Sequence, residues 1–176
     1  DRVEDAREAQ QDTVTQFRSA MEEFKSVTDF DGGDLESVFN RLNSSYEKSE
    51  SAAKNIENRV DKVVSATNRM LDEWKNELDD YHDASIRAKA EAQFDLTRQN
   101  AEQMINAMRN AAEKTAPVLN AFRDQVLFLK HNLNMQAITT LEAQTAEIEQ
   151  DVSTLIQEME NSIAEATTFI EQMGVI

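Results

Sequence analysis

The chain has 176 residues, no cysteine, three glycines and one proline, and its 34 acidic and 18 basic residues give a net charge of −16. The missing cysteine excludes disulfides and thiolate metal sites, and no stretch approaches the roughly 20 apolar residues that a membrane-spanning helix needs. The negative charge argues against binding to nucleic acid or directly to an anionic membrane, since both require clustered lysine and arginine.

The scarcity of turn residues and the abundance of good helix formers predict an all-α protein. Apolar residues recur at alternating steps of three and four, the heptad pattern of helices that supercoil around one another. Four segments, at about 2–28, 35–81, 85–131 and 135–173, carry this pattern. We therefore expect a single helical rod domain over 1–176, an elongated antiparallel four-helix coiled-coil bundle.

The first segment ends in the turn TDFDGGD, residues 28–34. Two glycines there permit left-handed backbone, and Asp34 suits the N-cap of the next helix. The calcium-loop pattern fails, because Asn40 stands where a bidentate glutamate is required. Capping and solvation are the expected roles of Asp29, Asp31 and Asp34, with weak cation binding as the alternative.

Helices over 35–81 and 85–131 would each span roughly 70 Å. The short turn between them makes them antiparallel, with Asp83 or Ser85 as the N-cap of the second. Pro117 removes a backbone hydrogen bond inside the second of these helices, so we expect a kink near that residue.

The first and fourth helices are shorter and reach back only to about residues 60 and 96. The rod is therefore expected to thin to a two-helix hairpin tip around 72–94. Trp74 lies at this tip. It either belongs to an aromatic seal of the hairpin or contacts a partner, because two helices alone bury a tryptophan poorly.

The stretch FRDQVLFLKHNLN, residues 122–134, carries four consecutive apolar residues. Leu129 and Leu133 follow the heptad seam, but Leu127 and Phe128 lie roughly 130° to either side of it. A helix that is apolar all round is normally buried. We expect neighbouring helices to enclose this segment. The alternative is that Leu127 and Phe128 form a partner contact.

Nothing in the sequence is typical of an enzyme. His82 and His131 are expected at opposite ends of one helix, roughly 70 Å apart, so they cannot share a metal site within one chain. Neither a glycine-rich phosphate loop nor a recognisable Ser/His/Asp arrangement is present. We predict a non-catalytic protein without a cofactor or a metal site.

Several stretches resemble a bacterial family of proteins of unknown function, the domain of unknown function 2959. They are DRVEDAREAQ at the start, FKSVTDFDGGDLES at 24–37, LDEWKNELDDY at 71–81 and PVLNAFRDQVLFLKHNLN at 117–134. The resemblance implies a cell-envelope lipoprotein on the periplasmic side in gammaproteobacteria, with a signal peptide and a lipid-modified cysteine upstream of residue 1. It implies no activity and no site residues.

The leading hypothesis is a non-catalytic helical scaffold or protein–protein interaction module, whose partner is another protein or a second copy of the chain. One alternative is a cation-binding acidic helical protein. Another is a membrane-shaping helical module, which would require a basic face, whereas only the third segment is near neutral. We expect any membrane attachment to come from the upstream lipid and not from direct binding by this chain.

Overall fold

The computed structural model describes residues 2–30 and 32–174, which are helical almost throughout and include no strand. All four predicted segments are helical, which confirms the all-α class. The helices are α1 (Arg2–Ser26), α2 (Leu35–Glu77), α3 (Ala84–Glu113), α4 (Thr115–His131) and α5 (Met135–Gly174), and short 3₁₀ turns follow α1 (η1, Val27–Asp29) and α2 (η2, Leu78–Asp80).

Side-chain caps explain where three of the helices begin. The Asp34 carboxylate precedes α2 and accepts a hydrogen bond at 3.0 Å from the N–H two residues on. Asp83 precedes α3 and accepts two such bonds, each at 2.9 Å. Asn134 precedes α5 and accepts one from the Ala137 N–H at 3.1 Å. Each cap satisfies backbone donors that have no partner inside the helix.

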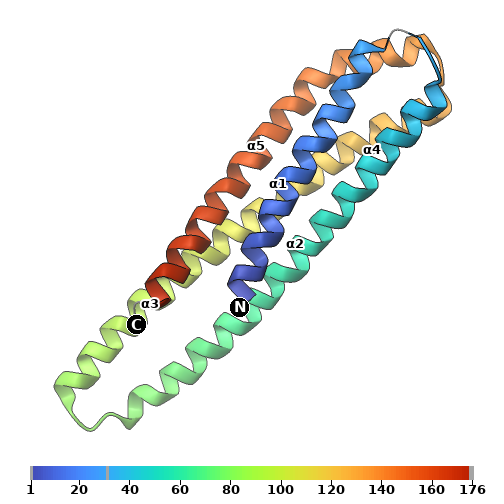
Figure 1. The fold of residues 1–176 in the computed structure, drawn as a ribbon. Helices are drawn as coiled ribbons and strands as arrows, with labels where there is room; N and C mark the ends of the chain where they lie inside the picture. Colours follow the sequence, from blue (N-terminus) through green and yellow to red (C-terminus); the bar gives the residue numbers. More distant parts are fainter. Residues whose placement is uncertain (1, 31, 175–176) are drawn as a thin grey trace.

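The third predicted segment is divided into two helices, because α3 ends at Glu113 and α4 begins at Thr115. Pro117 has no N–H to bond with the Glu113 carbonyl, and its ring crowds that carbonyl. It is tolerated because it lies in the first turn of α4, where N–H groups lack helical acceptors. Lys114 between the helices keeps helical backbone angles (φ −70°, ψ −14°), so α4 continues in the direction of α3 (Figure 1).

Apart from α3 and α4, which run in the same direction, helices that follow one another in the chain run in opposite directions (Figure 1). α1 packs beside α2 and α5, and the α3–α4 pair also packs beside α2 and α5, so α1 lies diagonally opposite α3–α4. Ion pairs of Arg18 with Glu160 and of Lys25 with Glu149 show that α1 and α5 are antiparallel. Since α1 begins and α5 ends part-way along the molecule, the hairpin of α2 and α3 projects beyond them (Figure 1).

Residues predicted to lie on the heptad seam form the core. Fully buried large side chains include Phe17, Leu42, Ile56, Met104, Phe122 and Leu155. The Phe122 ring of α4 stacks on Phe24 of α1, with ring centroids 4.4 Å apart, and more loosely on Phe17 at 6.2 Å. These contacts join the two diagonally opposite helices through the centre of the core.

The prediction for Leu133 was wrong. The heptad spacing placed it on the buried seam of the third segment, but its side chain is 46% exposed. The helix ends at His131, and Asn132 leaves helical geometry with φ −136° and ψ 63°. Leu133 therefore lies in the turn beyond the helix, where helical spacing no longer determines the direction of its side chain.

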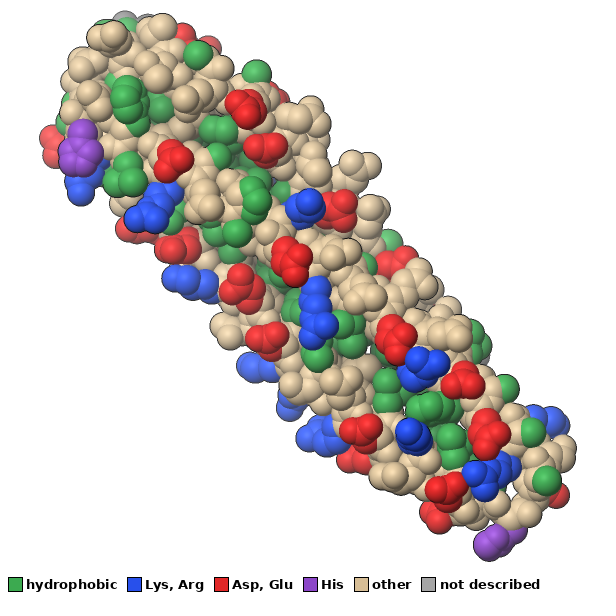
Figure 2. Space-filling model, turned by 180° about the vertical axis from the view of Figure 1, so that it is seen from behind, with side chains coloured by type: hydrophobic (Ala, Val, Ile, Leu, Met, Phe, Trp, Pro, Cys, Tyr) green, Lys and Arg blue, Asp and Glu red, His purple; other side chains and the backbone are tan. Residues whose placement is uncertain are grey.

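The surface is rich in charges of both signs, and Figure 2 shows acidic and basic side chains interspersed along one face. Residues 135–176 hold eight acids and no base, and bases of α1 pair with some of these acids. The side chains of these pairs are about half exposed, so each pair contributes at most about 1 kcal/mol. Because 34 acids stand against 18 bases, pairing each base with one acid would still leave 16 carboxylates unmatched.

Polar side chains interrupt the apolar core between α1 and α5. Gln10 and Ser162 are both fully buried, and the Ser162 hydroxyl donates a hydrogen bond to Gln10 Oε1 at 2.9 Å. The Nε2 of Gln10 has no hydrogen-bond partner among the described residues. This contact places a half-satisfied amide inside the core, an arrangement that costs stability but favours one alignment of the two helices.

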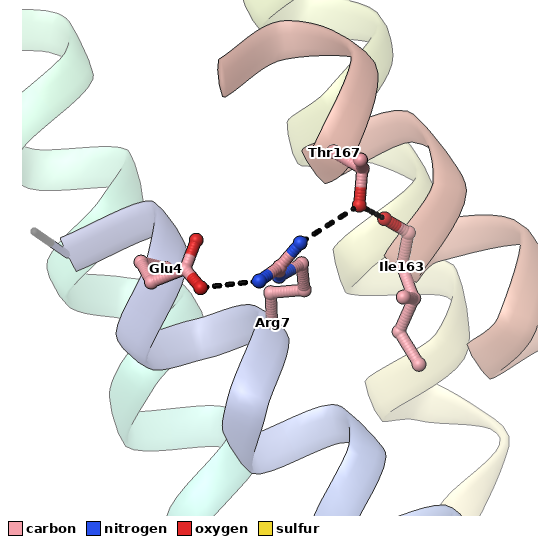
Figure 3. Close-up of polar contacts among 4 residues, drawn as sticks. All are labelled: Glu4, Arg7, Ile163 and Thr167. Carbon is pink, nitrogen blue, oxygen red and sulfur yellow. Dashed lines mark hydrogen bonds and ion pairs between the residues drawn. The ribbon is translucent and has the colours of Figure 1, made fainter. Parts of the chain in front are cut away.

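A second polar contact between these helices lies one turn nearer the chain start. Arg7 donates to the Thr167 hydroxyl at 3.2 Å and forms an ion pair with Glu4, while Thr167 donates to the Ile163 carbonyl at 2.9 Å (Figure 3). The Arg7 guanidinium thus reaches from α1 to α5. Its Nε is buried and has no partner among the described residues.

The buried Gln10–Ser162 contact predicts opposite effects for two variants. Ser162→Ala leaves Gln10 Oε1 unpaired as well, so the free energy of unfolding should fall by about 1–3 kcal/mol. Combining Ser162→Ala with Gln10→Leu removes both polar groups, and stability should return to the wild-type value or exceed it. Urea denaturation measures both changes. If the double variant is less stable than the wild type, the hydrogen bond is a net contributor to stability.

The charge excess predicts the response to salt. Unmatched carboxylates repel one another in the folded rod, and added salt screens that repulsion. The melting temperature should therefore be higher in roughly 500 mM NaCl than in roughly 20 mM. KCl should act like NaCl, because the effect is screening and not binding of one cation. A melting temperature that falls with added salt would mean that attractive ion pairs dominate.

Candidate functional site

Leu127 and Phe128 are exposed, and the expectation that neighbouring helices enclose them was wrong. Their exposed fractions are 41% and 38%, whereas Phe122 on the opposite side of α4 is fully buried. The reason is the arrangement of the helices. α4 packs beside α2 and α5, and α1 lies diagonally across the core, so no helix covers the back of α4.

Two further exposed apolar side chains follow Leu127 and Phe128 at this end of the molecule. Leu133 in the following turn is 46% exposed, and Met135 at the start of α5 is 55% exposed. We call these four residues the α4–α5 patch. Figure 2 shows hydrophobic side chains at the surface beside a histidine near this end. The heptad spacing placed Leu133 on the buried seam and gave no signal for Met135, because the spacing rules for helices do not apply where a helix ends.

The α4–α5 patch lies in the least acidic part of the chain. From Lys114 to Leu141 inclusive, the sequence has three lysine or arginine residues and a single acid, Asp124. Arg123, Lys130 and His131 lie on α4 close to the patch and are exposed. An apolar surface with basic neighbours thus stands out on a protein whose net charge is −16.

The hairpin tip is partly sealed by its own side chains. Trp74 of α2 is half-buried and meets Phe94 of α3 edge to face, with ring centroids 5.7 Å apart. Leu78 is buried, while Tyr81 and Ile86 remain exposed at the turn. Trp74 therefore packs within the hairpin, and its role as a partner contact stays a prediction.

Ion pairs of Arg87 connect the two sides of the hairpin turn. The Arg87 guanidinium donates to Glu91 at 2.9 Å and reaches Asp79 on the other side of the turn at 2.8 Å. The hydrogen bond to Glu91 is the main reason that the pKa of Arg87 is raised above its ordinary value. Arg87 is positively charged at any physiological pH, so it holds the two sides of the turn together.

Two hollows lie where α1 begins and α5 ends. One, of about 560 Å³, is lined mainly by apolar side chains that include Val63, Met70 and Phe169. The other, of about 750 Å³, lies between α3 and α5 and is lined partly by polar residues such as Asn100 and Gln172. They lie where the four-helix part of the molecule ends and the hairpin of α2 and α3 continues alone.

The cation-binding alternative gains no support from the described residues. Residues 2–30 and 32–174 contain no group of three or more His, Asp or Glu side chains arranged to hold a metal ion. In the turn after α1, Asp34 caps α2, and Asp31 lies outside the described residues. Over the same part of the chain, none of the helices has an apolar stretch long enough to cross a bilayer.

The model of a family described as "Protein of unknown function (DUF2959)" matches residues 1–173, nearly the whole chain. No curated protein and no solved structure matches the chain.

The exposure of Leu127 and Phe128 predicts that polar substitutions there leave the fold intact. Leu127→Asp and Phe128→Asp should each change the free energy of unfolding by less than about 1 kcal/mol, because the new carboxylate stays in water. Phe122→Ala, five residues before Leu127 and on the buried side of α4, should cost about 3–5 kcal/mol. Denaturant titration of the three variants checks this. Losses above about 2 kcal/mol for both aspartate variants would show that these side chains are part of the core.

Proposed function

We propose that this chain, which belongs to the DUF2959 family of proteins of unknown function, is a non-catalytic helical scaffold that binds a protein partner, a different protein or a second copy of the chain, through its α4–α5 patch. The observation that supports this most directly is the exposure of Leu127 and Phe128 within a run of four apolar residues. Exposed apolar clusters mark interaction sites more often than isolated apolar residues do.

The composition of the patch fits an interface. Its centre holds leucine and phenylalanine, and its neighbours Arg123 and Lys130 are basic. This agrees with the composition of protein interfaces, which favour aromatic residues and arginine and avoid acids at the centre. The patch also stands on a helix whose other side is anchored by the buried Phe122 and Leu129. A surface held this firmly loses little conformational freedom on binding.

The elongated shape supports a scaffold role. We infer that the heptad seam makes the helices supercoil as an antiparallel coiled-coil bundle, which thins to the two-helix hairpin tip. Such a rod separates the α4–α5 patch from the hairpin tip by most of the length of α2, whose 43 residues rise about 1.5 Å each. Contacts made at the two ends would therefore be held far apart.

The chemistry of the surface supports a non-catalytic role. His82 and His131 lie near opposite ends of the molecule, beyond reach of one another. The family resemblance of the chain further supports a location on the periplasmic side of the cell envelope, with a lipid anchor upstream of residue 1. A protein tethered in this way needs no membrane-binding face of its own, which agrees with its net charge of −16.

Photocrosslinking tests the proposed binding surface. Replacing Phe128 by a benzoylphenylalanine should give discrete covalent adducts in an envelope fraction of the native host, because the probe sits at the centre of the patch. The same probe at Ser153, an exposed polar position of α5, serves as the matched control and should give none. Equal labelling from both positions, or no adduct from position 128, would contradict the proposal.

A further inference from the structure

Four exposed residues form a single stripe along the back of α4: Asp124, Leu127, Phe128 and His131. At about 100° per residue, Asp124 and His131 differ by only about 20° around the helix, and Leu127 and Phe128 lie about 50° to either side of the line between them. The stripe therefore has charged or polar groups at its two ends and a pair of apolar groups at its middle.

This stripe is complementary to itself when two copies run antiparallel. If the twofold axis passes between Leu127 and Phe128, position i of one copy lies level with position 255 − i of the other. Asp124 of each copy then lies level with His131 of the other copy. The apolar residues of both copies meet around the axis. An imidazole N–H donates to a carboxylate in either charge state of the ring.

The distribution of charge also favours contact between two copies at this place. Two chains of net charge −16 repel each other over most of their surfaces. Only Asp124 is acidic between Lys114 and Leu141, so the repulsion is weakest there. The hairpin tip is a poorer surface, since residues 72–83 hold six acids and one base, and twofold contact would bring like charges together.

We infer that the partner of the α4–α5 patch is a second copy of this chain, bound with its α4 antiparallel so that Asp124 of each copy faces His131 of the other around a centre of Leu127 and Phe128. This inference rests on the proposed function and names its partner. From Pro117 to His131 the back of α4 is about 21 Å long, which is short for a stable interface. The dimer is therefore weak and reversible, with a dissociation constant on the order of 100 μM.

Charge exchange between the two ends of the stripe tests the pairing. Analytical ultracentrifugation of the wild-type chain from roughly 10 μM to 1 mM should show a monomer–dimer equilibrium. Asp124→Lys places a cation opposite His131, and His131→Glu places two carboxylates opposite each other, so each variant alone should dimerise at least about tenfold more weakly. In a dimer of one Asp124→Lys chain and one His131→Glu chain, the new lysine faces the new glutamate at one end. The native His131 faces the native Asp124 at the other end. The mixture should dimerise within about threefold of the wild type.

Both positions are exposed, so the variants should melt like the wild-type chain, and a melting curve confirms that they are folded. A wild-type chain that stays monomeric at 1 mM, or a mixture no stronger than the separate variants, would overturn the inference. The probe at Phe128 separates this failure from failure of the proposed function. Adducts to a different protein from a monomeric chain would leave the binding surface in place and reject the second copy, whereas the absence of any adduct would reject both.

Discussion

The narrowness of the apolar seam is the constraint on which the rest of the structure depends. Each helix carries a stripe that is just wide enough to meet its two neighbours, and Phe122 of α4 also reaches across the core to stack on Phe24 of the diagonal helix α1. The back of every helix is therefore left in water, and a side chain that leaves the seam has no place inside. Leu127 and Phe128 are exposed for this reason, although the run that contains them is apolar on every side.

The same constraint explains why polar contacts matter between α1 and α5. An apolar stripe that repeats every seven residues would allow one helix to shift along the other by a heptad with little loss of burial. The buried pair of Gln10 and Ser162 and the reach of Arg7 to Thr167 are satisfied in one alignment only. These contacts therefore determine where α1 begins beside α5.

Features that depend on nearby residues were predictable from the sequence, and features that depend on distant ones were not. The caps Asp34 and Asp83 follow from local turn chemistry, and burial of Phe17 and Ile56 follows from spacing along one helix. Whether a helix covers Leu127, by contrast, depends on the order of the helices around the core. Short turns determine only that successive helices are neighbours. The pairing of Gln10 with Ser162 likewise joins positions 152 residues apart, for which spacing along one helix carries no information.

The central claim is that the back of α4 is open in the single chain and is covered when a partner binds. Hydroxyl-radical footprinting over a range of protein concentrations measures this directly, because leucine and phenylalanine are oxidised only where solvent reaches them. In dilute protein, oxidation should be strong at Leu127 and Phe128 and low at Phe122. Oxidation at Leu127 and Phe128 should then fall as the protein concentration rises. Oxidation at Leu127 and Phe128 that is already as low as at Phe122 in dilute protein would contradict the claim.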